Sequence, residues 1–305
     1  MRIGINFGGE AGAGEGLIDD IVGLGREADA RGFSSFWMPN IFSFDAIGAL
    51  TVVGRETERI RVGTAVTPTY PRHPTALAQQ ALTAAAATGN RFTLGIGLSH
   101  RIVIEGMLGH SFERPARHMR EYLSVLMPAL RGEPVNFDGE HYRVRGLQLT
   151  VPGSAPVPTV VAALGPAMLK VAGELADGTI TWMVGLRTME DHIVKRLLAA
   201  AEAADRPAPR VVACVPVVVT NAPDEVRERI NRELFMYGQL PSYRAMLDRE
   251  GASGPADVAV VGDENAVRRQ LDGYRNVGVT DLSAVVMEVE TGSRQRTMDL
   301  LAAMP

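Results

Sequence analysis

The chain has 305 residues, enough for one large domain or two ordinary ones, and its 46% hydrophobic content can bury a substantial core. The formal net charge is −4 and no basic cluster occurs, so nucleic acid is an unexpected partner. No apolar run approaches the roughly 20 residues that cross a bilayer, and the first residues are typical of a strand rather than a signal peptide. We therefore expect a cytoplasmic protein without a membrane partner.

The single cysteine, Cys214, lies within an apolar run, which indicates a small core residue and excludes a disulfide or a cysteine-based metal site. We expect no metal. Glycine and proline are spread along the chain without a linker, which favours a single domain over residues 1–305.

Short β-branched runs alternate with longer segments whose apolar residues recur at helical spacing. The expected strands are Arg2–Phe7, Ser35–Met38, Ile60–Ala65, Phe92–Leu98, Val157–Ala163, Gly178–Met183, Val211–Val219 and Leu282–Met287. The expected helices are Leu17–Ala30, Asp45–Thr57, Thr75–Thr88, Arg114–Leu130, Ala167–Leu175, Met189–Ala204, Asp224–Leu247 and Glu264–Asn276. Eight such units in about 300 residues predict an α/β fold of the (β/α)8 barrel type, with an open, doubly wound sheet as the alternative.

Glycine and proline mark several helix ends in this pattern. Gly32 and Gly89 follow the first and third helices, where a left-handed residue ends a helix at low cost. Pro74, Pro166 and Pro223 stand where the third, fifth and seventh helices begin, because a helix start needs no N–H from its first residue.

Residues 132–153 interrupt the alternation. Here Asp138 and Gly139 separate two short alternating runs, which predicts a β-hairpin inserted between strands four and five.

Ligands of parallel α/β sheets bind at the carboxyl ends of the strands, so the residues after each strand are the candidates for a site. Asn40 follows the second strand and offers an amide donor and acceptor, although it also suits a turn. His100 is the only histidine at such a strand end and is a candidate for proton transfer or phosphate contact, with an exposed loop histidine as the alternative. His73, before Pro74, is more typical of a helix start.

The fifth strand leads into Leu164–Met168, where backbone N–H groups at a helix start can bind phosphate, although a plain turn has the same composition. The loop after the first strand lacks the GxGxxG spacing of a Rossmann dinucleotide site.

The order of these motifs resembles the luciferase-like superfamily of flavin and deazaflavin oxidoreductases, specifically the coenzyme F420-dependent branch that includes methylenetetrahydromethanopterin reductases. The resemblance covers essentially the whole chain. It is carried by Gly32-Phe33 with Trp37, Gly63–Pro68 with Arg72-His73-Pro74, Phe92–Gly97, and Ala167 with Ala172-Gly173 and Ala176-Asp177-Gly178.

The resemblance implies a deazaflavin at the carboxyl-terminal mouth of the barrel and hydride exchange through its C5 atom. It also implies a non-prolyl cis peptide at Ala65–Val66 and a homodimer. The cofactor-binding residues that it implies are Asn40, Ala65, Val66, Gly97, Leu98, Ser99, His100, Leu164, Gly165, Pro166, Ala167 and Met168. FMN is the alternative cofactor.

Two departures from the sugar-phosphate dehydrogenases of this branch bear on the substrate. Asn40-Ile41 stands where they carry Asp-His, and His100 where they carry glutamate, which makes sugar-phosphate oxidation doubtful. Large apolar side chains instead predict a substrate pocket for an uncharged or aromatic-bearing molecule, formed by Phe7, Phe42, Trp182 and Met183.

We therefore expect a reductase that delivers hydride from reduced F420 to a C=N or activated C=C bond of a small organic substrate. His100, Tyr70 or water would supply the proton. The alternatives are an FMN-dependent monooxygenase of the same superfamily and a barrel that binds a cofactor without catalysis.

Overall fold

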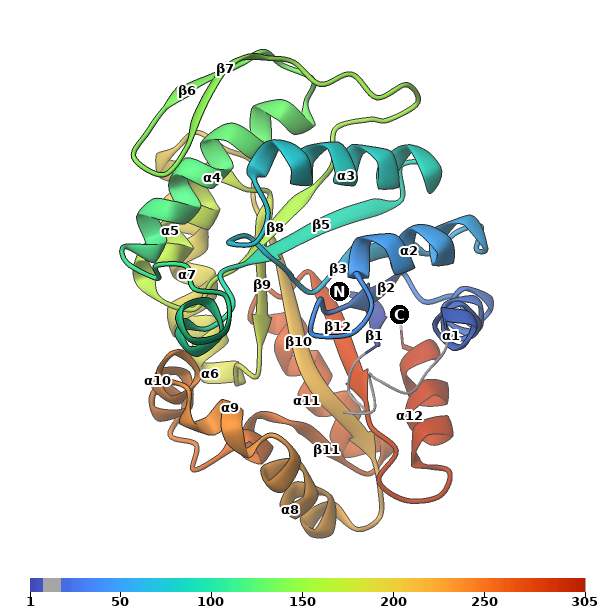
Figure 1. Ribbon diagram of the computed structural model, residues 1–305. Coiled ribbons are helices and arrows are strands. Elements are labelled where there is room, and N and C mark those ends of the chain that lie inside the picture. The colour runs from blue at the N-terminus through green and yellow to red at the C-terminus, as the bar shows by residue number, and fades with distance from the viewer. Residues whose placement is uncertain (8–17, 305) are drawn as a thin grey trace.

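A closed barrel of parallel strands forms the centre of the molecule (Figure 1). The computed structural model describes residues 1–7 and 18–304. In the described part, the barrel strands pair in the order β1-β2-β3-β5-β8-β9-β10-β12, and β12 returns to β1, which closes the barrel and rules out the open sheet. These strands are β1 (Arg2–Asn6), β2 (Ser35–Met38), β3 (Arg61–Thr64), β5 (Phe92–Gly97), β8 (Thr159–Ala162), β9 (Gly178–Trp182), β10 (Arg210–Val219) and β12 (Asp281–Val286).

Helices surround the barrel. They are α1 (Ile18–Ala30), α2 (Ala46–Arg55), α3 (Pro74–Ala87), α4 (Pro115–Leu130), α5 (Pro166–Leu175), α6 (Leu186–Thr188), the π-helix η2 (Met189–Val194), α7 (Lys195–Ala203), α11 (Glu264–Asn276) and α12 (Ser293–Ala302). Gly32 and Gly89 have φ of 82° and 61°, and Pro74, Pro166 and Pro223 each open a helix, as expected. Leu17, the expected start of the first helix, and the loop after β1 lie outside the described residues. No described helix is long and apolar enough to cross a membrane.

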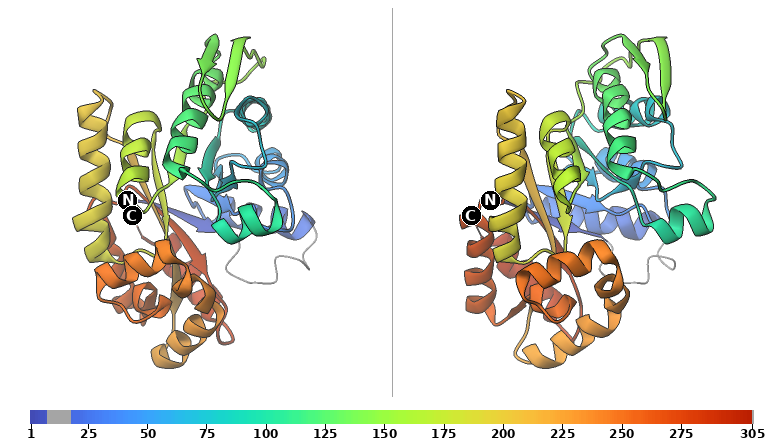
Figure 2. Two further views of the ribbon diagram at one scale, coloured as in Figure 1. Left: turned by 60° about the vertical axis from the view of Figure 1, so that its left-hand side comes forward. Right: turned by 90° about the vertical axis from the view of Figure 1, so that its left-hand side faces the viewer.

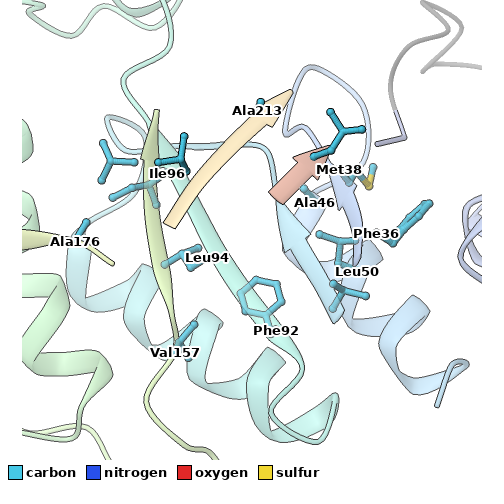
Figure 3. Packing of buried hydrophobic residues seen from close by; sticks show 14 of the residues in the cluster. Phe36, Met38, Ala46, Leu50, Phe92, Leu94, Ile96, Val157, Ala176 and Ala213 are labelled. Carbon is cyan, nitrogen blue, oxygen red and sulfur yellow. The ribbon is translucent and has the colours of Figure 1, made fainter. Parts of the chain in front are cut away.

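Alternation along the strands creates two packing layers. Phe92, Leu94 and Ile96 of β5 face outward and pack with residues of the surrounding helices, such as Leu50 of α2 (Figure 3). The intervening Gly95 and Gly97 face the barrel interior, where a Cβ at Gly97 would lie 2.6 Å from Val66 Cγ2. Small residues therefore leave room inside the barrel, while the outer layer carries most of the apolar core.

Two groups of polar side chains in the barrel interior are held by hydrogen bonds and ion pairs. Asn6 Nδ2 donates to Ser283 Oγ at 3.0 Å and to Cys214 Sγ at 3.3 Å, and burial raises the pKa of that thiol to about 12. Cys214 is thus the unreactive core residue that the sequence indicates. Deeper in the barrel, Asp281 binds Arg2 and Arg210; burial opposes its ionisation, but these guanidinium groups lower its pKa.

The expected hairpin is present as β6 (Val135–Asp138) and β7 (Arg143–Leu147), and β6 packs against α4. The buried carboxylate of Glu121 on α4 accepts the backbone N–H groups of Glu140 at 3.2 Å and His141 at 2.7 Å. Gly139 is required in this turn, because a Cβ there would lie 2.5 Å from Glu121 Oε2. One carboxylate therefore fastens the turn of the hairpin to the barrel's helical layer.

The prediction of one helix over Asp224–Leu247 was wrong. The segment forms α8 (Pro223–Glu233), α9 (Phe235–Gln239) and α10 (Pro241–Glu250), with the break before Pro241 where proline favours an extended preceding residue. The segment η3 (Pro255–Val258) and the short strand β11 (Val260–Gly262), which pairs with β10, follow. The prediction also missed α12 and the two-residue strand β4 (Thr67–Pro68). Figure 2 shows α8–α10 gathered at the end of the molecule opposite the hairpin.

Candidate functional site at the barrel mouth

Asn40 closes the end of β2 and contacts the neighbouring strand end. Its backbone N–H donates to the carbonyl of Val66 at 3.3 Å, and its Oδ1 accepts from Ala46 N at 3.2 Å and Arg72 Nη2 at 3.3 Å. The Ala46 N–H and the Arg72 guanidinium are both donors, so the acceptor atom Oδ1 of the Asn40 amide, and not Nδ2, must face them. The turn role that the sequence allowed is therefore present, and the Nδ2 group faces away from these bonds.

The end of β3 carries the cis peptide bond at Ala65–Val66 that the resemblance implies. Ala65 and Val66 are partly exposed and pack with the interior residues Trp37, Val160 and Ile180. Gly95 and Gly97 of β5 allow the backbone of this bend to come close, since a Cβ at Gly95 would lie 1.9 Å from the Thr64 carbonyl oxygen. Val66 thus lies at the mouth, above the interior layer.

Beyond β5, Leu98, Ser99 and His100 are each partly buried. Ser99 has φ of 60°, a left-handed conformation that costs a non-glycine residue about 1–2 kcal/mol, and it turns the chain immediately before His100. Burial lowers the pKa of His100, so its imidazole is uncharged at neutral pH. The π-helix η1 (Ile102–Met107) follows directly.

Beyond β8, Leu164 leads into α5, whose first residues Gly165, Pro166 and Ala167 are exposed, while Met168 is partly buried. No side chain caps this helix start, and the first N–H groups of a helix have no partner within it. His192 Nε2 donates to the Leu164 carbonyl at 2.7 Å, and Arg196 Nε donates to His192 Nδ1 at 3.1 Å. The helix start is therefore held in place by the neighbouring helix while its N–H groups stay open.

At the end of β9, Trp182 and Met183 behave differently. The Nε1 atom of Trp182 is buried and has no hydrogen-bond partner in the described part of the chain. Met183 has φ of 52° and is 0% exposed, packed with Leu247 and Val258. The prediction that Met183 lines a substrate pocket was therefore wrong, because the left-handed turn directs its side chain into the packing beneath α10.

Tyr70 packs against rings of α4 and of the segment after η1. Its ring stacks on His118 of α4, with centroids 4.0 Å apart, and on Phe112, with centroids 5.5 Å apart. Its buried hydroxyl has no partner among the described residues, and burial raises its pKa to about 12. The structure thus places Tyr70 in the support of the segment after η1.

The two remaining predicted pocket residues differ in burial. Phe7 is partly buried against the main core, and its N–H donates to the Trp37 carbonyl at 2.8 Å. Phe42 is 71% exposed in the loop after β2.

Sequence reasoning missed Tyr237 on α9 and Tyr243 on α10. The His100 ring lies 6.5 Å from the Tyr237 ring and 5.8 Å from the Tyr243 ring, measured between centroids. Pro241 is the one residue in the expected helix that indicates a break. The helix α10 that begins there places Tyr243 over the mouth. His73, by contrast, caps α3 through Nδ1, which accepts from Thr75 N at 3.3 Å, as expected for a helix start.

These observations define a (β/α)8 barrel whose candidate site lies at the mouth formed by the ends of β2, β3, β5, β8 and β9. Residues 1–281 match the luciferase-like monooxygenase family, and the chain belongs to that family.

The named relatives agree with this assignment. The chain is 29% identical over 252 residues to the 5,10-methylenetetrahydromethanopterin reductase of Archaeoglobus fulgidus, covering 80% of this chain and 71% of that protein. It is 28% identical over 235 residues to the F420-dependent glucose-6-phosphate dehydrogenase of Mycobacterium avium, covering 72% and 70% of the two chains. The fold matches the F420-dependent tetrahydromethanopterin reductase of Methanopyrus kandleri with a TM-score of 0.82 at 20% identity, over 99% of this chain and 97% of that one.

Proposed function

We propose that this protein is a coenzyme F420-dependent oxidoreductase that reduces a C=N or activated C=C bond of a small organic substrate. Two of the relatives, the Mycobacterium avium dehydrogenase and the Methanopyrus kandleri reductase, are named as F420-dependent, which supports the cofactor. Bound reduced F420 would supply a hydride, that is, two electrons and one hydrogen, to one atom of the double bond, whose other atom takes a proton.

The observation that carries the proposal is the direct contact between separate segments that the resemblance assigns to the cofactor. Asn40 N bonds to Val66 O, and Val66 fits against Gly97, which immediately precedes Leu98-Ser99-His100. A planar ring system needs such a close backbone approach, and the glycines permit it. The residues present therefore fit a deazaflavin ring.

The open helix start at α5 would hold the phosphate of the cofactor tail. The N–H groups of Ala167 and Met168 follow Pro166, and the helix dipole favours an anion there. His192 and Arg196 fix the preceding carbonyl of Leu164. Asn40 would present its Nδ2 group to the edge of the ring.

His100 would move the proton. Since burial keeps the imidazole uncharged, one ring nitrogen can give its proton to the reacting atom while the other takes a proton from solvent. Tyr70 is held between His118 and Phe112 by ring stacking, so we assign it to the support of the site rather than to proton transfer.

The experiment is a parallel titration of cofactor-free protein with F420 and with FMN, followed by absorbance and fluorescence. Saturable binding of F420 with much weaker binding of FMN, together with oxidation of reduced F420 by an imine or enone, supports the proposal. Preference for FMN with oxygen consumption would instead assign a monooxygenase, and binding without turnover of any acceptor would leave a cofactor-binding barrel. Ala167→Pro, which removes one N–H at the α5 start, should weaken F420 binding about tenfold.

A further inference from the structure

Four rings from four different elements meet at one side of the mouth. We call them the mouth rings: His100 after β5, Trp182 at the end of β9, Tyr237 on α9 and Tyr243 on α10. Trp182 and Tyr237 meet edge to face at 6.0 Å, and Tyr237 and Tyr243 at 5.5 Å. Edge-to-face pairs fix the orientation of each ring, so the group is a built arrangement rather than a loose patch.

Trp182 faces the barrel axis. It lies two residues after Ile180 on β9 and so shares its face, and Ile180 packs inside the barrel with Trp37 and Val212. Tyr237 and Tyr243 are half-buried and pack, together with Trp182, against Met183 and Leu247. Burial raises the pKa of both phenols.

One hydrogen-bond donor in this group is unused. Trp182 Nε1 is buried without a partner among the described residues, and indole N–H is a donor only. A buried donor without an acceptor costs about 1–3 kcal/mol, so such a group usually has a partner in the functional state. An acceptor oxygen or nitrogen on a ligand would satisfy it.

Two arginines that adjoin mouth rings in the sequence are already paired. Arg101, next to His100, binds Glu105 at 2.6 Å, and Arg244, next to Tyr243, binds Asp248 at 2.7 Å. The mouth rings themselves offer aromatic surface and neutral hydrogen-bond donors, and none of the four carries a positive charge at neutral pH.

The rim beside the rings is apolar. Ile102 and Met107 of η1 are 70% and 62% exposed, and Phe235 and Met236 of α9 are 58% and 66% exposed. Both elements adjoin mouth rings, since His100 precedes η1 and Tyr237 follows Met236. A ligand held by the rings would therefore meet apolar surface where it leaves the site.

We propose that the mouth rings bind an uncharged, planar substrate in which the reducible bond is conjugated with a carbonyl or aromatic group. The ring system of the substrate contacts Tyr237 and Tyr243, and its carbonyl oxygen accepts the Trp182 Nε1 hydrogen. The proposal names the substrate class of the proposed reductase and so rests on that function.

The test compares two ligands of nearly equal shape. Calorimetric titration of the protein saturated with oxidised F420 uses the neutral enone 4-phenylbut-3-en-2-one and the anion trans-cinnamate. The enone is expected to bind at least tenfold more tightly than cinnamate. Equal or tighter binding of cinnamate overturns the proposal, because the mouth rings carry no positive charge that would offset the desolvation of a carboxylate.

Single substitutions test each proposed contact between the substrate and a mouth ring separately. Trp182→Phe, which keeps a ring and removes the N–H, should weaken enone binding about tenfold, and Tyr237→Leu and Tyr243→Leu should each do the same. Phe137→Leu, a ring on β6 at the opposite end of the molecule, is the matched control and should change nothing. The conservative Tyr237→Phe and Tyr243→Phe serve if a leucine variant fails to fold. Unchanged enone binding in Trp182→Phe, or an equal loss in Phe137→Leu, contradicts the assignment.

F420 affinity is measured separately in every variant by cofactor fluorescence. Retained F420 affinity with lost enone binding locates the defect in the mouth rings. If the unaltered protein does not bind F420, the proposed function fails. The enone and cinnamate titrations are then run on cofactor-free protein and decide the ligand class by the same criteria.

Discussion

The imidazole of His118 lies flat on the ring of Tyr70, with centroids 4.0 Å apart and planes 6° apart. His118 Nε2 also hydrogen-bonds Thr69 Oγ1 at 3.0 Å, so α4 holds two consecutive residues beyond β4. Phe112 covers the other side of Tyr70, and Arg101 lies over the Phe112 ring at 5.4 Å. This stack joins α4 to the segment that contains η1, and it explains why Tyr70 supports the mouth instead of acting in it.

Removal of the Tyr70 hydroxyl should leave catalysis nearly intact. The hydroxyl has no partner among the described residues, so Tyr70→Phe should change kcat less than about threefold and leave stability equal or slightly higher. His100→Gln should lower kcat at least about 100-fold, because it removes the proton-transfer group. Steady-state oxidation of reduced F420 by an enone measures both, and a comparable loss in the two variants would contradict the assignment of His100.

The stability of the protein should fall in acid because of His118. Burial lowers its pKa from 6.5 to about 4, so between these values the unfolded chain binds more protons than the folded one. Stability is therefore lost as the pH falls through this window, by about 2 kcal/mol between pH 7 and pH 5. Urea unfolding at both pH values measures the loss. His118→Phe should reduce this loss of stability between pH 7 and pH 5 by about 2 kcal/mol. The exposed His110→Gln should leave the loss unchanged.

Enlarging Gly97 should displace Val66. In Gly97→Ala the new Cβ would lie 2.6 Å from Val66 Cγ2 and 3.2 Å from Ala162 Cβ. Overpacking of this kind costs about 1–3 kcal/mol of stability, and we expect F420 affinity to fall at least tenfold as Val66 moves. Gly23→Ala on α1 is the control, because nothing lies within 4 Å of its Cβ and alanine favours a helix by about 1 kcal/mol. Unaltered cofactor affinity in Gly97→Ala would separate Val66 from the cofactor site.

Loss of the Glu121 carboxylate should loosen the hairpin. Glu121→Ala leaves the N–H groups of Glu140 and His141 without their acceptor and should cost about 2–3 kcal/mol in denaturant unfolding. Glu133→Ala breaks only the exposed pair with Arg131 and should cost less than about 1 kcal/mol. Hydrogen exchange of residues 135–147 should rise in Glu121→Ala alone. Equal protection in both variants would show that the hairpin is held elsewhere.

The barrel could be predicted from the sequence because each strand and helix has a local residue pattern, and this pattern repeats along the chain. Runs such as Phe92–Gly97 are apolar throughout, as buried parallel strands require, and Pro74 and Pro166 mark the helix starts directly. Because the carboxyl ends of neighbouring parallel strands meet at one edge, the residues after β2, β3 and β5 could be expected to adjoin one another. The structure shows this for Asn40 N with Val66 O and for Gly97 with Val66.

The side of the mouth formed by α9 and α10 could not be predicted in the same way. The residues from Asp224 to Leu247 have helical spacing throughout, and only Pro241 indicates the change of direction that brings Tyr243 to His100. The left-handed turn at Met183 is likewise invisible in the pattern, since methionine carries no preference for it, yet it decides that Trp182 faces the mouth and Met183 the core.

The pairing of β10 with β11 has a consequence for how this protein can diversify. β10 pairs with β9 up to Cys214 and, further along, with β11 through Val217, Val218 and Val219. The chain that carries α8, α9 and α10 therefore departs from one strand and rejoins its hydrogen-bonded neighbour, so its two attachment points stay fixed whatever lies between them. Such a segment can be lengthened, shortened or exchanged between homologous barrels as a cassette, which offers a direct route to new ligand preferences on an unchanged scaffold.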